Sequence, residues 1–154
     1  MTRLRAFTEM LAQHDSATLA LEAWCGHPLV ALPLEASLAP CLAPEVITPA
    51  LACRPHETIH ARHVRLCCDG RTVAIASNWY VPERLTPAMN ALLASTDTPF
   101  GRVVAPLDFR RTLLDSRSAA RDDAILTHHA LLTMPDGRPL AYVIECYRPA
   151  VLQF

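Results

Sequence analysis

The chain has 154 residues, of which 51% are hydrophobic and 19% are charged, and its formal net charge is -1 at pH 7. This length suits one domain that buries its own core, and the composition excludes a disordered chain. A near-zero net charge argues against a protein that binds nucleic acid or membranes through a basic face. All 14 basic residues are arginines, which excludes chemistry that needs a lysine amine.

Helical spacing of apolar residues predicts a first helix over residues 2–13. Asp15 or Ser16 is expected to cap a second helix that runs to about Trp24, because a short polar side chain accepts the first free backbone N–H groups. Gly26 follows at the position where a left-handed residue ends a helix. The N-terminal third therefore begins with two short helices.

A strand interrupted by Pro33 is predicted over residues 28–38, and a proline in that place implies a sheet edge or a bulge. Residues 39–55 contain four prolines. This composition predicts an irregular surface loop that is long enough to act as a flap or lid.

The middle of the chain predicts a β-hairpin, with strands over residues 60–67 and 72–80. The turn between them, residues 68–71, contains Asp-Gly, which is a strong hairpin signal between apolar runs. Pro82 ends the second of these strands.

Later elements complete the pattern. A helix is predicted to begin at residues 86–87, a close backbone approach at 98–102, and a strand at 107–114. A second hairpin joins strands over 125–134 and 140–147. Runs of strands with helices between them and no βαβ rhythm predict an α+β domain with a mostly antiparallel sheet.

Cysteines and histidines give no metal signature. The spacing of the cysteines matches no zinc pattern, and adjacent residues on a strand point to opposite faces, so His128 and His129 make a poor chelate. Neither a signal peptide nor an apolar run long enough to span a membrane is recognisable. The sequence therefore predicts a cytoplasmic protein with no metal and reduced thiols at six positions: Cys25, Cys41, Cys53, Cys67, Cys68 and Cys146.

Two charged residues stand on apolar faces of predicted strands. Arg62 shares a face with Val64, and Glu145 shares a face with Val143 and Tyr147. Burying either charge is costly unless it is paired. The alternation of side chains along a strand, which we call parity, leaves two interpretations open. Arg62 and Glu145 form a structural ion pair across the sheet, or they line a cavity for a carboxylated ligand.

Five ordered segments resemble bacterial chorismate lyase (chorismate–pyruvate lyase), and the resemblance covers about residues 10–150. In chain order they are Arg-His-Val-Arg-Leu-Cys-Cys-Asp-Gly at 62–70, Val-Pro at 81–82, Thr-Pro-Phe-Gly-Arg at 98–102, Gly-Arg-Pro-Leu at 137–140 and Glu-Cys-Tyr-Arg-Pro at 145–149.

The resemblance implies a single α+β domain over residues 1–154, with flanking helices and an enclosed ligand cavity. It implies conversion of chorismate to 4-hydroxybenzoate and pyruvate without metal or cofactor, while the near-zero net charge already predicts no nucleic acid as partner. Arg62 and Glu145 take the places of the ligand-holding arginine and the site glutamate of that family. Phe100 takes the place that offers a backbone N–H to the substrate, and Ala17 the place of a pocket methionine.

Two departures from the family pattern bear on the site. Ala17 replaces the methionine, which widens the expected pocket, and a family Trp-x-Arg-Arg-Ser stretch is replaced around Thr127, His128 and His129. The two histidines either pack within the strand or supply positive charge in place of arginine. The alternative to a chorismate lyase is therefore a non-catalytic binding domain of the same fold for a small aromatic carboxylic acid.

Overall fold

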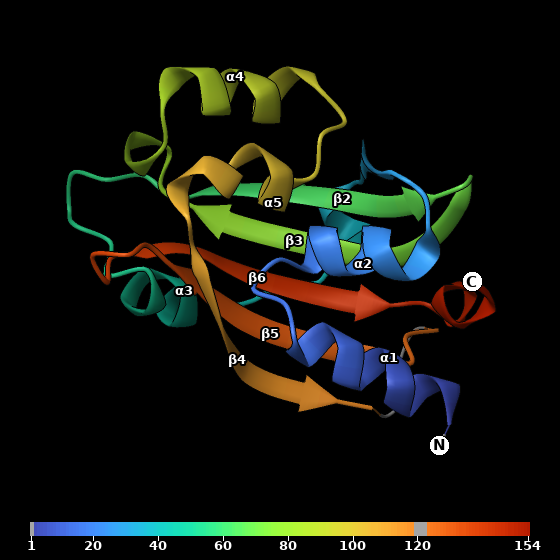
Figure 1. Cartoon of the computed structure of the whole chain (residues 1–154). Helices are drawn as coiled ribbons and strands as arrows, with labels where there is room; N and C mark the ends of the chain where they lie inside the picture. The colour runs from blue at the N-terminus through green and yellow to red at the C-terminus, as the bar shows by residue number, and fades with distance from the viewer. Residues whose placement is uncertain (1, 119–122) are drawn as a thin grey trace.

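Six strands form one antiparallel sheet in the computed structural model, which describes residues 2–118 and 123–154 (Figure 1). In spatial order they are β1 (Leu29–Pro33), β2 (His60–Cys68), β3 (Arg71–Tyr80), β6 (Pro139–Tyr147), β5 (Leu126–Thr133) and β4 (Arg110–Arg117). The prediction of an α+β domain built on an antiparallel sheet is confirmed.

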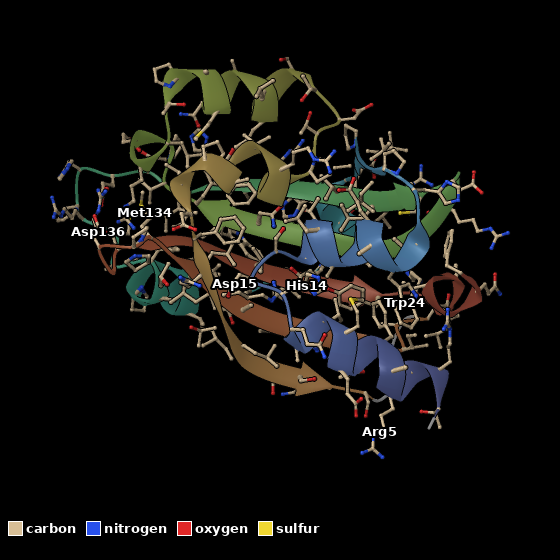
Figure 2. The ribbon with its side chains drawn as sticks, in the orientation of Figure 1. Arg5, His14, Asp15, Trp24, Met134 and Asp136 are labelled. Atoms are coloured by element: carbon tan, nitrogen blue, oxygen red, sulfur yellow. The ribbon has the colours of Figure 1, made fainter. Side chains whose placement is uncertain are left out.

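Both predicted hairpins are present, and they pair with each other in the middle of the sheet. Asp69 and Gly70 turn β2 into β3 with positive φ values of 49° and 74°, and Gly137 turns β5 into β6 with φ 89°. Figure 2 labels Met134 and Asp136 beside this second turn. The central β3–β6 pairing brings Glu145 opposite Ala76, so that this carboxylate lies deep in the sheet.

The helices α1 (Arg3–Ala12), α2 (Ala17–Cys25) and α5 (Phe100–Val103) lie on one face of the sheet, and α4 (Pro87–Ser95) lies near β2 (Figure 1). The predicted caps of the second helix are confirmed: Ser16 Oγ accepts the Leu19 N–H, and Gly26 ends the helix with φ 74°. Four short 3-10 helices complete the regular structure: η1 (Ala36–Leu38), η2 (Pro82–Arg84), η3 (Ala105–Leu107) and η4 (Pro149–Gln153).

The helix-covered face carries two apolar clusters. One surrounds Phe7, whose ring makes edge contacts with Trp24 and Tyr147 at centroid distances of 5.3 and 5.2 Å. The other cluster packs α4 and α5 against strands β3, β5 and β6, and it includes the contact between Tyr80 and Phe100. Polar side chains are gathered where these two clusters meet.

The opposite face is covered by α3 (Pro44–Ala50), a helix inside the segment that the sequence predicted as an irregular loop. That prediction is wrong because Pro44 occupies the first helical position, where a missing N–H costs nothing, and Pro49 stands only in the last turn. Two buried α3-region side chains, Ile47 and Leu51, pack against three from the sheet: Trp79, Tyr142 and Ile144.

Within residues 2–118 and 123–154, no helix combines the length and the apolar character that crossing a bilayer requires.

Candidate functional site

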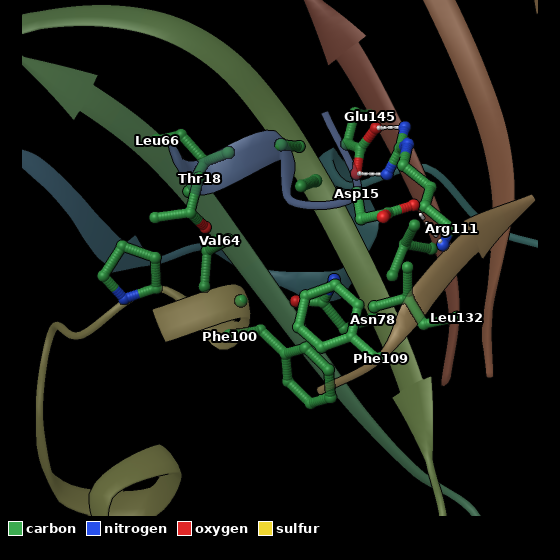
Figure 3. A pocket seen from close by; sticks show the side chains of 15 residues that line it. Asp15, Thr18, Val64, Leu66, Asn78, Phe100, Phe109, Arg111, Leu132 and Glu145 are labelled. Atoms are coloured by element: carbon green, nitrogen blue, oxygen red, sulfur yellow. Dashed lines mark hydrogen bonds and ion pairs between the residues drawn. The ribbon is translucent and has the colours of Figure 1, made fainter. Parts of the chain in front are cut away.

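A small cavity of about 40 Å³ lies between the helices and the sheet, where the two apolar clusters meet (Figure 3). Its wall is mainly apolar and includes the rings of Phe100 and Phe109. The polar or charged lining residues are Asp15, Thr18, Asn78, Arg111 and Glu145. We call this cavity the Arg111–Glu145 pocket.

Arg111 and Glu145 form a two-pronged ion pair at this pocket. Arg111 Nη1 donates to Glu145 Oε2 at 3.0 Å and Nη2 donates to Oε1 at 2.5 Å, and the two side chains are 9% and 6% exposed. The Tyr147 hydroxyl also donates to Oε1, at 3.1 Å. Burial disfavours the charged guanidinium, but the charge and hydrogen bonds of Glu145 outweigh it and raise the pKa of Arg111.

Asp15 ties the loop between α1 and α2 to β4, which is an edge strand (Figure 2). Its Oδ1 accepts the backbone N–H of Arg111 at 3.1 Å, and its Oδ2 accepts Arg110 Nη1 at 3.3 Å. Arg110 is exposed and lies outside the pocket lining, so among the described lining residues Arg111 is the one cation and it faces two carboxylates, Asp15 and Glu145.

The roof of the pocket is formed by a close approach of α5 to the start of α2. A Cβ on Gly101 would lie 2.8 Å from Thr18 Oγ1 and 3.1 Å from Ser16 Oγ. A Cβ at this distance would force the Thr18 side chain to shift, which confirms the close approach predicted at residues 98–102.

The structure brings together three of the six residues that the sequence singled out. Ala17, Phe100 and Glu145 line the Arg111–Glu145 pocket. The other three side chains, Arg62, His128 and His129, line other cavities.

Arg62 lies in a separate cavity of about 350 Å³ between β2 and the end of α4. Its Nη2 donates to the Thr96 carbonyl at 3.1 Å, and its buried Nη1 has no partner among the described residues. Burial lowers its pKa, against the opposing effects of Tyr80 and Asp97. The interpretation that Arg62 pairs with Glu145 is therefore wrong, because Arg111 holds that carboxylate.

The two histidines point to opposite faces of β5, as neighbours on a strand must. His128 is buried against the Tyr147 ring, at 5.8 Å between centroids, and burial lowers its pKa. A neutral His128 supplies no positive charge near pH 7. His129 lies on the α3 side, with Nδ1 at 3.0 Å from the Tyr142 hydroxyl oxygen.

Arg111 was not among the predicted site residues. The signal was present, because Phe109, Arg111 and Leu113 alternate along a predicted strand and put an arginine on an apolar face. The same parity argument that singled out Arg62 and Glu145 would have found it. Among the residues that the structure describes, no cluster of three or more histidine, cysteine or acidic side chains is placed to hold a metal ion.

Comparison with known proteins gives one sequence relative and several structural ones. The uncharacterized protein y4mC from Sinorhizobium fredii is 36% identical over 181 residues, which include 98% of this chain and 76% of that protein. No known family description matches the sequence.

The structural relatives are regulator domains. The effector domain of PhnF from Mycobacterium smegmatis superposes with a TM-score of 0.64 at 15% identity, over 88% of this chain and 90% of that domain. The chain spans 65% of whole PhnF. A domain from Bordetella bronchiseptica, described as the ligand-binding domain of a GntR-family transcriptional regulator, gives 0.51 at 18% identity, over 70% of this chain and 78% of that one. At such identities the likeness concerns the fold.

These findings correct the functional prediction. The prediction of a chorismate lyase, and of an enzyme, is wrong: the matching structures are regulator effector and ligand-binding domains, and Arg62 does not reach the pocket that holds Glu145. What remains of the resemblance is a related fold. By its sequence, the chain belongs to the same family as the rhizobial protein y4mC.

Proposed function

We propose that the chain is a non-catalytic binding domain that recognises a small aromatic carboxylic acid in the Arg111–Glu145 pocket. The observation that carries the proposal is the unused hydrogen-bonding capacity of Arg111. A guanidinium has five N–H donors, and Arg111 gives two of them to Glu145. The other N–H groups donate to no residue of the described chain and are available to a second carboxylate.

The apolar wall supports an aromatic ligand body. Phe100 and Phe109 both face the pocket (Figure 3), and aromatic rings pack well against each other at offset or edge geometries. Ala17 lies at the first turn of α2, where the helix N-terminus favours a negative charge. A benzoate-like ligand would thus set its ring against the phenylalanines and its carboxylate towards Arg111.

Ligand entry requires the pocket to widen. A volume of about 40 Å³ suits little more than a water molecule, so an aromatic acid has to displace Phe100 and, with it, α5. Since α5 is pressed onto α2 through Gly101, binding would separate the two helices. A domain that changes shape on binding has the property that a ligand sensor needs.

Thermal unfolding in the presence of 4-hydroxybenzoate tests the proposal, with the neutral 4-hydroxybenzamide as the matched compound. Ligand at a hundredfold excess over Kd stabilises a folded domain by about 2.7 kcal/mol, and we expect this from the acid and not from the amide. Phe109→Ala should weaken the effect, whereas Arg110→Gln, at the exposed ion pair with Asp15, should preserve it. Equal stabilisation by the amide, or release of pyruvate from chorismate, would overturn the proposal.

A further inference from the structure

A much larger cavity lies on the opposite face of the sheet, and residues of α3 form part of its lining. Its volume is about 740 Å³, against about 40 Å³ for the Arg111–Glu145 pocket. Small-molecule sites in proteins commonly measure 300–1,000 Å³. We call it the α3 pocket, and its lining is Leu42, Pro44, Ile47, Thr48, Cys53, Arg54, Pro55, Glu57, Thr58, Ile59, Ala61 and Trp79.

The floor of the α3 pocket is apolar and firmly held. Trp79 is buried, and its ring makes edge contacts with Tyr142 and His63, each at a centroid distance of 6.2 Å. Ile47 of α3 belongs to the same buried cluster, and Ile59 packs against it. An indole face fixed in this way offers a flat surface for an aryl or alkyl group.

The one acidic group of the lining is already neutralised. Glu57 accepts from Arg84 Nε at 3.3 Å and Nη2 at 3.0 Å, and from the Arg54 backbone N–H at 2.9 Å. The hydrogen bond from Arg84 lowers the pKa of Glu57 to about 2, so the pair stays ionised and its charges cancel.

Arg54 leaves the α3 pocket with an unbalanced positive charge. No ion pair or hydrogen bond joins its guanidinium to another residue of the described chain, although its backbone is fixed by Glu57. A guanidinium pairs with both oxygens of a carboxylate. The charge and the apolar floor therefore favour the same kind of molecule, which is an acid with a bulky apolar body.

We propose that the α3 pocket is a second ligand site that binds an amphipathic monocarboxylate, with its apolar body on Trp79 and its carboxylate at Arg54. Thr48 and Thr58 line the same cavity, and their hydroxyl groups can donate hydrogen bonds. The site lies across the sheet from Arg111 and Glu145 and shares no lining residue with the Arg111–Glu145 pocket.

Cys53 provides a reporter inside the α3 pocket. Its Sγ lies 3.6 Å from the carbonyl oxygens of Arg54 and Glu57, and the residue is part of the lining. A bound ligand should therefore shield this thiol from alkylation. Cys41 is exposed outside the pocket and serves as the matched thiol.

The experiment measures binding of 2-naphthoate and 2-naphthamide to the full chain by calorimetry, together with iodoacetamide labelling of Cys53 and Cys41 read by peptide mass spectrometry. We expect the acid to bind at least about tenfold more tightly than the amide, and to slow labelling of Cys53 alone. Arg54→Gln should bring the acid down to the affinity of the amide. Arg65→Gln, which removes an exposed arginine of β2 outside the pocket, should leave both affinities unchanged.

Three results would overturn the α3 site: no binding of 2-naphthoate, binding that leaves Cys53 unprotected, or an affinity that Arg54→Gln does not change. Its failure is separable from that of the proposed function. A 4-hydroxybenzoate signal that survives Phe109→Ala and disappears in Arg54→Gln would move that ligand to the α3 pocket and refute the assignment to Arg111.

Discussion

Two buried arginine–glutamate pairs stand on opposite faces of the sheet, and they use their arginines differently. Arg84 and Glu57 are 8% and 10% exposed, close to the 9% and 6% of Arg111 and Glu145. Arg84 places all five of its N–H donors: two on Glu57, and three on the carbonyls of Leu51, Ala52 and Pro139. Arg111 places two.

The difference separates a structural ion pair from one that is open to a ligand. Arg84 ties the segment after α3 to the start of β6, and a guanidinium with no spare donor has nothing to offer a bound molecule. Arg111 lies at a cavity with donors to spare. Burial and pairing alone would not distinguish the two sites, whereas the number of committed donors does.

The largest effect is expected from Arg111→Ala. It leaves Glu145 buried without its partner, which should lower the free energy of unfolding by about 3–5 kcal/mol. Arg111→Met combined with Glu145→Leu removes both charges and should restore most of that loss, since well-packed apolar residues replace a buried pair at little cost. Urea denaturation measures both, and a double variant as unstable as the single one would contradict this account.

Arg84→Ala should cost about 3 kcal/mol, because the part-buried carbonyls of Leu51 and Pro139 and the exposed carbonyl of Ala52 each lose a hydrogen bond worth about 1 kcal/mol. Here Arg84→Met combined with Glu57→Leu should not restore stability, since Leu51, Ala52 and Pro139 still lack a donor. Exposed Arg110→Ala is the control and should change stability by less than about 1 kcal/mol. Equal rescue of the two double variants would remove the distinction between the ion pairs.

Gly101→Ala tests the close contact between α5 and α2 at the roof of the Arg111–Glu145 pocket. The added methyl meets Thr18 Oγ1 at 2.8 Å, and overpacking outweighs the gain in helix propensity. We expect a net loss of about 1 kcal/mol in thermal or urea unfolding, and partial recovery when Thr18→Ala is added. The α3 pocket should keep its affinity for 2-naphthoate in this variant, and a change there would show that the two faces are coupled.

The smallest effect is expected from the histidines on the two faces. Burial lowers the pKa of both His128 and His63 in the folded chain, so the unfolded chain binds these protons first as the pH falls. These histidines therefore leave the free energy of unfolding unchanged above about pH 6.5, the ordinary pKa of histidine. Below that pH they lower it. Glu145 opposes this shift at His128, and Arg111 adds to it.

Urea unfolding at pH 7.5 and 5.5 checks this dependence. His128→Gln and His63→Gln should each flatten it, whereas His60→Gln, at an exposed position, should not. A wild-type chain that is more stable at pH 5.5 than at pH 7.5 would contradict the predicted direction of the pH dependence.

Much of the fold was predictable from local signals. Two Asp-Gly turns, the Ser16 cap and Gly26 each act within a few residues, and all are found where the sequence indicated them. The helix at 44–50 was not, because the number of prolines in a segment does not show which position of a helix each one occupies. Its stability comes from burying Ile47 against Trp79, a contact between distant segments.

The site was predictable only in part, for a related reason. Parity placed Glu145 on a buried face, and its burial is confirmed. Parity does not tell which of several arginines reaches that carboxylate, since this depends on strand order. The sheet places β6 between β3 and β5, with β4 beyond. Arg111 reaches Glu145 across β5, while Arg62 is turned towards Thr96.

The hydrogen bond from the Arg111 backbone N–H to Asp15 has one more consequence. This amide has as its partner a side chain in the loop between α1 and α2, and not a backbone carbonyl of a neighbouring strand. Its rate of deuterium uptake should follow detachment of that loop alone, with the rest of the sheet still closed. The exchange rate of this one backbone amide therefore reports how often the loop beside the pocket opens.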